Sequence, residues 1–310
     1  MSEIFAGIDL GGTGTRLVAC GAKGILASAI LATKDLGEGD LETRLTRLAA
    51  AIHTLVPEGE VLGGIGIGAT GPVDRAEGIV HNLDTLPAFS KIPLVAELKK
   101  RLGVPVVIDN DAVVAAIAEQ RVGAGKGAAR MLMVTLGTGI GAAFLVDGVP
   151  FRGPIGAHPE AGHIPIVSGV GKCYCGAEGC WEQVASRSAL QAMVRPYLPS
   201  NLQGKDLLPY AAAERSDRQI CEAFDTYGAL VGKGLSILHT LYMPEVTILG
   251  GTAANYLDLF QGGLVRAMER APGFAVESSV RVSALGDEAG AIGAALISSE
   301  PVNDFKLGLD

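Results

Sequence analysis

The residues of this chain whose types and spacing could bind a metal ion lie in one stretch, residues 158–182. Cys173, Cys175 and Cys180 have the spacing C-x-C-x4-C, and His163 precedes the first of them by ten residues. Three thiolates and one imidazole can form a closed tetrahedral shell, and Zn2+ is the usual ion in such a shell. Because four protein ligands leave no coordination position for water or substrate, we predict a structural zinc ion.

Other interpretations of these residues stay open. The three cysteines could form a disulfide or remain buried thiols, although two that are one residue apart make a poor disulfide. His158 could replace His163 as the fourth ligand. Cys20, in an apolar strand-like run, and Cys221, in a helix-like run, are typical of reduced cysteines in a cytosolic protein.

Two carboxylates flank the proposed ligands. Glu160 lies three residues before His163, and Glu182 lies two residues after Cys180. A metal ion that fixed this loop would also fix the directions in which both acids point. The loop therefore predicts a pocket for a polar substrate.

Composition limits the class of substrate. The chain has 310 residues, is 48% hydrophobic, and carries a formal net charge of −8, so we expect two domains and a small-molecule substrate. Clustered Lys and Arg, which nucleic-acid binding requires, are not found. The sequence has neither a signal-peptide pattern nor an apolar run of membrane-spanning length. We therefore expect a soluble, cytoplasmic protein that binds neither nucleic acid nor membrane.

A glycine-rich turn near the N-terminus could bind phosphate. The apolar run 4–10, which contains Asp9, is followed by the turn GGTGT at 11–15 and by a second apolar run, 17–20. Glycines let the backbone approach a phosphate, and the free N–H groups of such a turn form an anion nest. A plain hairpin turn is the alternative.

The same pattern recurs about 125 residues later. Residues 134–141 (VTLGTGIG) follow the apolar residues 131–133 and precede a strand-like run, 142–146. Two copies of strand, Gly/Thr turn and strand indicate two related half-structures, each with a phosphate-binding hairpin facing a shared cleft. Neither copy has the spacing of a P-loop or of a dinucleotide-binding turn, so we exclude those classes.

The remaining elements must position these turns. In the first half we predict a helix over 41–55, a strand over 61–68, a Gly-Pro turn over 69–74, a helix over 94–102 and a strand over 104–108. That strand leads to Asn110 and Asp111, and an alanine-rich helix begins at residue 112. Either residue could simply cap this helix, but a carboxylate at a strand-to-helix switch is also well placed for catalysis.

The second half has fewer chemical signals. We predict a long amphipathic helix over 220–238, ended by Pro244, and then a strand over 246–249. The glycines at 250–251 that follow could admit a flat ring. The last predicted helix, 289–298, is rich in small residues, and its glycines favour close packing over chemistry.

Together these motifs resemble the ROK family (repressors, open reading frames and kinases) of the sugar-kinase/actin-like ATPase superfamily. The resemblance covers nearly the whole chain. The matching motifs are Asp9-Leu10-Gly11-Gly12-Thr13, Gly71-Pro72-Val73-Asp74, Asn110-Asp111-Ala112, Leu136 to Gly141, Glu160-Ala161-Gly162-His163, Cys173 to Gly176, Gly179 to Glu182, and Leu249-Gly250-Gly251.

The resemblance implies an α/β fold of two actin-like, ribonuclease H-like domains with a cleft between them. We expect an N-terminal domain over residues 1–111, completed by the C-terminal helix 289–310, and a C-terminal domain over 112–288 that carries the zinc-binding loop. The resemblance also implies an ATP-dependent kinase of free hexoses that uses ATP, Mg2+ and a structural Zn2+. We expect a homo-oligomer, a dimer.

The resemblance also implies roles for single residues. Asp111 would be the general base, and Asp9 would orient Mg2+ through water. The residues expected to bind the sugar are Gly71, Asn110, Asp111, Glu160, His163 and Glu182. The residues expected to bind ATP and its phosphates are Asp9, Gly11, Gly12, Thr13, Gly137, Thr138, Gly139, Gly250 and Gly251. The zinc ligands would be His163, Cys173, Cys175 and Cys180.

Three departures from the family pattern affect what can be carried over. Gly14 stands where a lysine is common, Val113 replaces a frequent asparagine, and the stretch after Asn82 lacks the usual tryptophan. Family frequency alone favours glucose, phosphorylated at its 6-hydroxyl. N-acetylmannosamine, N-acetylglucosamine, mannose, fructose and polyols stay open as substrates.

Members of a different functional class also occur in this family. Some are DNA-binding repressors that sense sugars, and their helix-turn-helix precedes the first phosphate turn. Asp9 lies only eight residues after Met1, so we expect no such module. A sugar-binding protein without turnover is the remaining alternative, and we expect such a protein to have lost Asp111 or a Gly/Thr turn.

Overall fold

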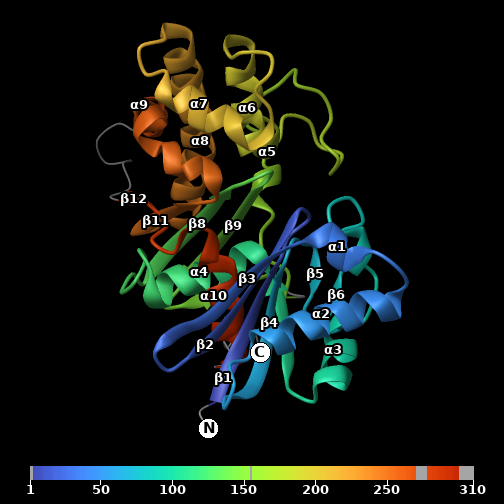
Figure 1. Ribbon diagram of the computed structural model, residues 1–310. Helices are drawn as coiled ribbons and strands as arrows, with labels where there is room; N and C mark the ends of the chain where they lie inside the picture. Colours follow the sequence, from blue (N-terminus) through green and yellow to red (C-terminus); the bar gives the residue numbers. More distant parts are fainter. Residues whose placement is uncertain (1–2, 154–155, 270–277, 300–310) are drawn as a thin grey trace. The chain divides into compact units, whose positions relative to one another are not determined.

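Two five-stranded sheets with the same strand order organise the chain (Figure 1). The computed structural model describes residues 3–153, 156–269 and 278–299. Contacts divide the chain into unit 1 (Met1–Ala129, Ala143–Pro159 and Ala284–Asp310) and unit 2 (Arg130–Ala142 and Glu160–Ser283).

The sheet of unit 1 has the order β3-β2-β1-β4-β7. Its strands are β1 Glu3–Leu10, β2 Gly14–Gly21, β3 Gly24–Ala32, β4 Val61–Ala69 and β7 Val106–Asn110. The first three strands form an antiparallel meander, and β4 and β7 continue the sheet parallel to β1. The carboxyl ends of β1, β4 and β7 therefore lie at one edge, where ligands bind in open α/β sheets.

The central strand β1 packs alternate residues on the two faces of this sheet. On β1, Ile4, Ile8 and Leu10 pack in a core with residues of α2 (Leu41–Leu55) and α3 (Leu94–Leu102). Phe5 faces the other side, where it packs against a smaller cluster that includes residues of the last helix, α10. This period of two is that of a strand covered on both faces.

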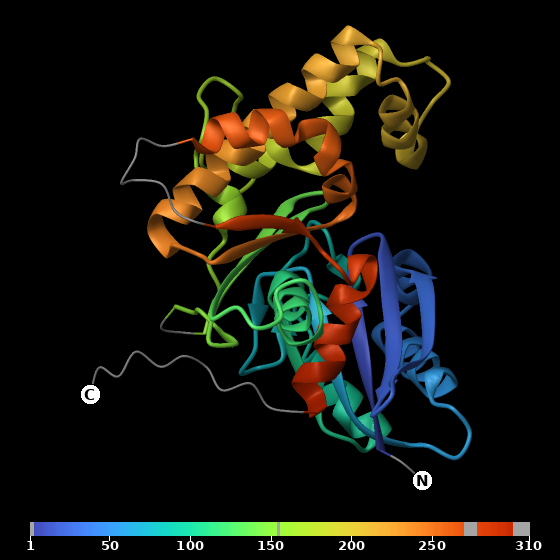
Figure 2. The ribbon, with the colours of Figure 1, turned by 90° about the vertical axis from the view of Figure 1, so that its left-hand side faces the viewer.

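Glycines let α10 (Ala289–Ser299) approach the sheet closely (Figure 2). Gly7 of β1 and Gly66 of β4 are paired across the strands. A Cβ atom on Gly7 would lie 1.9 Å from Ala291 O, and one on Gly66 would lie 1.7 Å from Ala294 O. On α10 itself, a Cβ atom on Gly293 would lie 1.8 Å from Val114 O of α4 (Asp111–Val122). This close contact confirms the prediction that the glycines of the last helix serve packing.

The second sheet has the order β10-β9-β8-β11-β12. Its strands are β8 Arg130–Leu136, β9 Ile140–Val146, β10 Val149–Pro150, β11 Val246–Gly250 and β12 Ser279–Val282. As in the first sheet, the central strand begins a hairpin with a Gly/Thr turn and pairs with a parallel strand from later in the chain. The predicted duplication of strand, turn and strand is thus present in the topology.

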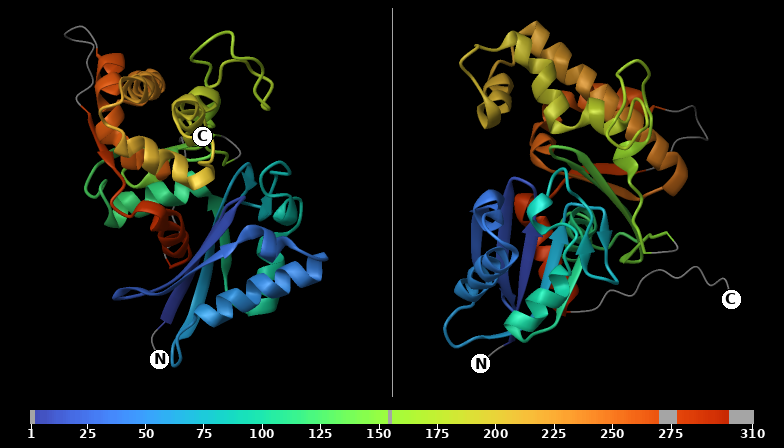
Figure 3. Two further views of the ribbon diagram at one scale, coloured as in Figure 1. Left: turned by 45° about the horizontal axis from the view of Figure 1, so that its top comes forward. Right: turned by 90° about the vertical axis from the view of Figure 1, so that its right-hand side faces the viewer.

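Helices cover this sheet within unit 2 (Figure 3). They are α5 Trp181–Ala185, α6 Arg187–Val194, α7 Leu207–Ala213, α8 Arg218–Tyr242 and α9 Leu257–Met268. The longest, α8, packs along α9 through glycines, since a Cβ atom on Gly228 would lie 2.0 Å from Phe260 O. The predicted helix over 220–238 is therefore confirmed, although it begins at Arg218 and ends at Tyr242.

Short elements complete the fold. They are α1 Thr33–Gly37, β5 Val73–Asp74, β6 Ile79–Val80 and the 3-10 turns η1 Pro87–Phe89, η2 Ala161–His163, η3 Arg195–Tyr197, η4 Gly204–Asp206, η5 Thr252–Tyr256 and η6 Gly286–Glu288. None of the helices in the described ranges combines the length and apolar character needed to cross a bilayer.

The two contact units differ from the predicted domains, 1–111 and 112–288. Helix α4 belongs to unit 1, where it packs on α10 and β4, whereas the predicted boundary placed it in the second domain. Residues 143–159 also belong to unit 1. Compactness alone does not define an evolutionary domain, so the predicted boundary stays a prediction. Of the predicted C-terminal helix 289–310, residues 300–310 lie outside the described part.

The contact between α10 and the sheet makes a testable prediction. Gly66→Ala should destabilise the protein by about 3 kcal/mol or more, because the added methyl group would overlap the backbone of α10. Gly64→Ala, on the same strand, is the matched control, since its Cβ would lie 3.4 Å from a side-chain atom of Phe5. Urea denaturation of the wild type and both variants measures the free energy of unfolding. If Gly66→Ala were as stable as Gly64→Ala, α10 would not pack closely on the sheet.

Candidate active site and metal centre

Two carboxyl groups, Asp9 on β1 and Asp111 at the start of α4, interact at the carboxyl-terminal edge of the sheet in unit 1. Desolvation raises the pKa of Asp9 to about 7, with a further contribution from Asp111 and a smaller opposing one from Arg16. Desolvation also raises the pKa of Asp111. Gly290 of α10 lies against Asp9, since a Cβ atom there would be 2.7 Å from Oδ2. Two desolvated carboxyls side by side favour a bound cation.

Asp111 is held in place by neighbouring donors. Its Oδ1 accepts a hydrogen bond of 2.8 Å from the N–H of Ala112, and the side chains of Thr70 and Asn110 also hydrogen-bond to it. Asn110 is the N-cap of α4, where its Oδ1 accepts from the N–H groups of Ala112 and Val113. Asn110 is thus the N-cap of α4, while the carboxyl of Asp111 also accepts from the first turn of the helix through the N–H of Ala112.

A buried ion-pair cluster surrounds Asp109, the residue before Asn110. Asp109 accepts hydrogen bonds from both terminal nitrogens of Arg152, at 3.2 and 2.5 Å, and its Oδ2 lies 3.1 Å from Nε of Arg75. The side chains of Asp109 and Arg152 are 2% and 3% exposed. Burial lowers the pKa of His158 to about 4, an effect that Asp109 opposes and Arg152 reinforces. This cluster joins three separate chain segments at the end of β7, two residues before Asp111.

The first Gly/Thr turn is closed by its own backbone and by neutral hydroxyls. Gly11 N donates to Gly14 O at 3.2 Å, and the hydroxyl of Thr33 donates to Gly11 O at 2.6 Å. Gly12 must lack a side chain, because a Cβ atom would lie 2.4 Å from Thr85. The lack of a side chain at Gly12 therefore lets Thr85 pack directly on the turn.

The neighbouring turn at Gly71 is tied down by an asparagine. Nδ2 of Asn82 donates to Gly71 O at 2.7 Å, and Oδ1 of Asn82 accepts from the N–H of Thr85. Asn82 thus links the Gly71 turn to the residue that packs on Gly12. The sequence did not indicate this role, because the two segments are 11 residues apart and have no shared pattern.

The second Gly/Thr turn, in unit 2, carries a positive charge. Gly137 N donates to Gly139 O at 3.0 Å, and the backbone N–H of Arg187 donates to Gly137 O at 2.8 Å. Nη2 of Arg187 donates to the hydroxyl of Thr138 at 3.0 Å. Its Nε is buried and has no hydrogen-bond partner among the described residues, so the contact with Thr138 comes from the terminal nitrogen alone.

The Gly250-Gly251 turn lies beside the second Gly/Thr turn. In the parallel pair of β8 and β11, Gly250 is opposite Thr135. Gly251 has φ +76°, and a Cβ atom there would lie 2.7 Å from the backbone of Leu136. The structure therefore brings together the two glycine motifs of unit 2 that the sequence assigned to ATP.

The predicted metal ligands also come together. One side-chain donor atom from each of His163, Cys173, Cys175 and Cys180 lies within 4.8 Å of the others. Cys173 Sγ is 3.6 Å from His163 Nδ1, and Cys175 Sγ is 3.6 Å from Cys180 Sγ. A tetrahedral shell with zinc bonds of about 2.0–2.3 Å separates its ligand atoms by roughly 3.3–3.8 Å, so this donor set fits zinc. His158, the alternative ligand, is not in this cluster; it lies beside Asp109 and Arg152 in unit 1.

The metal-ligand loop has few regular elements of its own and is held at its ends. At its start, Gly162 in η2 lies against β9, since a Cβ atom would be 2.2 Å from Ile140 O. At its end, the buried Trp181 donates from Nε1 to Leu230 O of α8 at 3.1 Å, and its ring covers Gly234. The loop therefore starts and ends on rigid elements.

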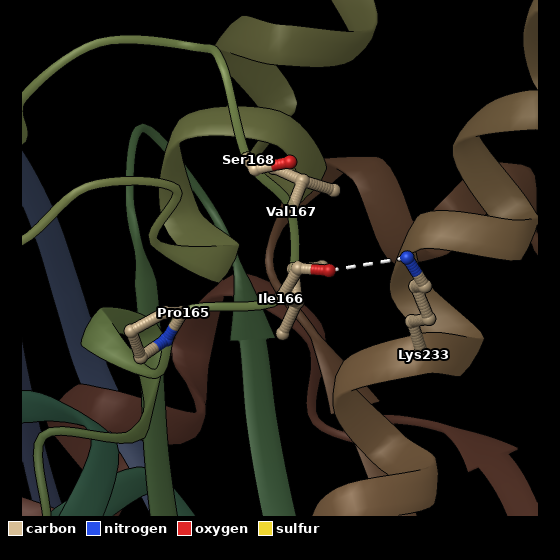
Figure 4. Close-up of a pocket in the computed structure, with 5 residues that line it drawn as sticks. All are labelled: Pro165, Ile166, Val167, Ser168 and Lys233. Atoms are coloured by element: carbon tan, nitrogen blue, oxygen red, sulfur yellow. Dashed lines mark hydrogen bonds between the residues drawn. The ribbon is translucent and has the colours of Figure 1, made fainter.

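Lys233 adds a third attachment of the metal-ligand loop, to α8 (Figure 4). Nζ of Lys233, on α8, donates to Ile166 O at 3.1 Å beside an open pocket of about 510 Å3 that residues 165–168 line. The same strand-like segment pairs with the end of the loop through Ile166 N and Gly179 O, which are 2.9 Å apart. These bonds fix the chain between His163 and the cysteines.

The two predicted sugar-binding carboxylates lie on this loop. Oε2 of Glu182 accepts a hydrogen bond of 2.9 Å from the N–H of Ile140, the residue directly after the second Gly/Thr turn. Glu182 also interacts with the hydroxyl of Tyr174, and Glu160, the residue before η2, contributes to the electrostatics of that same tyrosine. Glu160, His163, Tyr174 and Glu182 therefore form one polar group.

The structure thus collects the predicted residues into a local group in each unit. In unit 1 these are Asp9, Gly11, Gly12, Thr13, Gly71, Asn110 and Asp111; in unit 2 they are Gly137, Thr138, Gly139, Glu160, His163, Cys173, Cys175, Cys180, Glu182, Gly250 and Gly251. Sequence reasoning missed Asp109 with Arg152, the pairing of Arg187 with Thr138, and Tyr174. Only Tyr174 had a local signal, its place between two cysteines.

Comparison with known proteins agrees with these features. The family model described as ROK family matches residues 5–300. A glucokinase of Thermotoga maritima is 30% identical over 313 residues, covering 96% of this chain and 97% of that protein. The crystal structure of a ROK family glucokinase from Streptomyces griseus in complex with glucose and AMPPNP has a TM-score of 0.79 at 28% identity, covering 96% of this chain and 99% of that one.

The relatives also include regulators. The DNA-binding transcriptional repressor Mlc of Escherichia coli is 27% identical over 253 residues, which cover 79% of this chain and 62% of the repressor. The structural similarity confirms the predicted α/β fold of the actin-like ATPase superfamily.

The raised pKa of Asp9 makes stability depend on pH. Between the ordinary pKa of 3.8 and about 7, the folded state binds a proton at Asp9 that the unfolded state has released, so stability should fall as pH rises through this window. Asp9→Asn should remove this fall, which we expect to be on the order of 2–4 kcal/mol. Urea denaturation from pH 5 to pH 8 without divalent cations measures it. If the free energy of unfolding changed with pH in the same way for the wild type and the variant, Asp9 would not be desolvated in the folded state.

Proposed function

Because the chain belongs to the ROK family, we propose that it is an ATP-dependent sugar kinase that transfers the γ-phosphoryl group of ATP to a hydroxyl of a free hexose. Two classes of residue support this: carboxyls that can accept a proton and bind a cation, and glycine turns that can surround phosphates. The observation that carries the proposal is the Asp111 carboxyl, at a strand-to-helix switch beside Asp9.

Asp111 is suited to act as the general base. Its carboxyl is oriented by three donors, and desolvation raises its pKa, which makes the carboxylate a stronger base than an exposed aspartate. It would accept the proton of the attacking hydroxyl. The buried Asp109 cluster would keep the strand end that carries Asn110 and Asp111 in place.

Asp9 is the residue we assign to Mg2+. Oxygen ligands suit this ion, and a cation would offset the desolvation and the repulsion from Asp111 that together raise the pKa of Asp9. Bound there with ATP, Mg2+ would neutralise phosphate charge. The backbone of Gly11, Gly12 and Thr13 and the turn Gly137 to Gly139 would contact the phosphates, and Gly250 with Gly251 would contact the nucleotide.

The metal-ligand loop would recognise the sugar. Glu160, Glu182 and His163 would bond to sugar hydroxyls, with Gly71 and Asn110 as further contacts. The zinc ion would hold this loop in shape, because His163 and the three cysteines complete its shell. Zinc and Mg2+ would therefore have separate tasks.

Glucose is the sugar we propose, with its 6-hydroxyl as the acceptor. The relatives with glucokinase names and the complex with glucose and AMPPNP support this choice. N-acetylmannosamine, N-acetylglucosamine, mannose, fructose and polyols are the alternatives to test. A coupled ADP-release assay across this panel identifies the substrate, and absence of ADP release with every sugar would overturn the proposed kinase activity.

A sugar-sensing protein without turnover is the alternative from a different class, since repressors match the chain as well. The sensor needs the sugar-binding loop but no general base or phosphate turns. The retained, oriented Asp111 and the paired glycine motifs of unit 2 favour the kinase. Sugar binding without ADP release would favour the sensor.

The role of Asp111 can be tested directly. Asp111→Asn keeps the size of the side chain but cannot accept the proton, so kcat should fall by about two orders of magnitude or more. The affinity for ATP, measured by calorimetry, should survive. Asp35→Asn, at an exposed aspartate of α1, is the control. Near-normal turnover of the Asp111 variant would contradict a catalytic role.

The metal site makes a second prediction. Cys175→Ser should lose zinc and sugar binding together, because the loop that aims Glu160 and Glu182 depends on the intact shell. Excess Mg2+ should restore neither. Cys221→Ser, at an exposed cysteine of α8, is the matched control. Elemental analysis and sugar-binding calorimetry measure both effects; a zinc-free variant with normal sugar affinity would disprove the structural role.

Arg187 provides a third test. Its contact with Thr138 places a guanidinium at the second phosphate turn, so Arg187→Ala should raise KM for ATP about tenfold or more while KM for sugar changes little. Arg218→Ala is the control, because that side chain, at the first residue of α8, is 91% exposed and pairs only with the exposed Glu222 among the described ion pairs. If both KM values stayed unchanged in the Arg187 variant, its guanidinium would serve only the fold.

A further inference from the structure

One tyrosine connects two of the residues that we assign to the sugar. Tyr174 lies between the ligands Cys173 and Cys175, and its hydroxyl is 3.1 Å from Nε2 of His163. The carboxylate of Glu182 is hydrogen-bonded to the same hydroxyl. The rings of Tyr174 and His163 meet edge to face, with centroids 5.0 Å apart. The phenol thus occupies the space between an imidazole and a carboxylate.

The protons of these three groups can be assigned. Nδ1 of His163 faces the sulfur cluster, 3.6 Å from Cys173 Sγ, so the ring proton belongs on Nε2 when Nδ1 binds a metal. Nε2–H then donates to the phenol oxygen, and the phenol O–H donates to Glu182. The phenol accepts one hydrogen bond and donates one, which is also what a sugar hydroxyl would do at this position.

We propose that Tyr174 competes with the sugar: its hydroxyl takes the place of one sugar hydroxyl between His163 and Glu182, and the side chain moves out when sugar binds. This inference rests on the proposed function. It makes the binding-competent state only a fraction of the free protein, so the apparent sugar affinity is lower than the site could provide.

Tyr174 has little to keep it in place besides these hydrogen bonds. It is 75% exposed, whereas Trp181, at the end of the same loop, is fully buried and tied to α8. Cys173 and Cys175 hold the backbone on either side of Tyr174, so rotation of the side chain alone would release the hydroxyl. The loop structure would survive this rotation, because its attachments are at η2, Lys233 and Trp181.

Removing only the hydroxyl tests the proposal. Tyr174→Phe should bind sugar about three- to thirtyfold more tightly than the wild type, the range expected when one or two competing hydrogen bonds are lost. Zinc content should stay the same. Tyr210→Phe, at a partly exposed tyrosine of α7, is the matched control and should bind like the wild type. Isothermal calorimetry with glucose, N-acetylmannosamine and mannose measures the affinities.

Equal or weaker binding by Tyr174→Phe would overturn the proposal, since it would mean that the hydroxyl is inert or assists the sugar. If the wild type phosphorylates sugar but Tyr174→Phe binds sugar no more tightly, the competition by Tyr174 is refuted and the proposed kinase function stands. A wild type that neither binds nor phosphorylates any sugar of the full panel, including N-acetylglucosamine, fructose and polyols, would refute the proposed function and the competition with it.

A second measurement uses the unmodified protein. Saturating sugar should increase nitration of Tyr174 by tetranitromethane, because the hydroxyl is released from His163 and Glu182. Peptide mass spectrometry locates the nitrated tyrosine, and Tyr210 in the same sample serves as the internal reference. Protection of Tyr174 by sugar, or no change, would contradict its displacement.

Discussion

The close approach of α10 to the sheet of unit 1 is the constraint on which the acid pair depends. The helix can reach β1 and β4 only because Gly7 and Gly66 form a cross-strand pair without side chains beneath it. This contact brings Gly290 against the carboxyl of Asp9 and contributes to its desolvation. The packing that stabilises the unit therefore also raises the pKa of Asp9. A site that destabilises its own charged form is suited to bind a cation there.

The metal-ligand loop follows a different principle, since its middle has little apolar core. Its ends are fixed by packing, at Gly162 on β9 and at Trp181 on α8, whereas its middle depends on the Cys3His cluster. Ligands from both ends of the loop meet in that cluster, so a metal ion would cross-link the segment where hydrophobic burial is lacking. The exposed Tyr174 can then move without disturbing the loop.

Sequence reasoning succeeded where the signal is local and failed where it is not. The two Gly/Thr turns, the helix cap at Asn110 and the spacing of the cysteines are short-range patterns, and the structure forms each of them. Asp109 and Arg152 are 43 residues apart, and Arg187 and Thr138 are 49 residues apart. No short-range sequence pattern relates residues at such separations, so neither pair could be predicted. The strand before the helix α4 was predicted over 104–108 but spans Val106–Asn110. The prediction followed the apolar run, and the last two residues of the strand, Asp109 and Asn110, are polar.

The two Gly/Thr turns have the same topology but different electrostatics. The first is supported by the hydroxyls of Thr15 and Thr33, which are neutral, and Gly14 stands where the family commonly has a lysine. The second has Arg187 bonded to Thr138. A guanidinium presents several donors in a fixed plane, whereas a lysine is a mobile point charge, so the two are not equivalent at a phosphate.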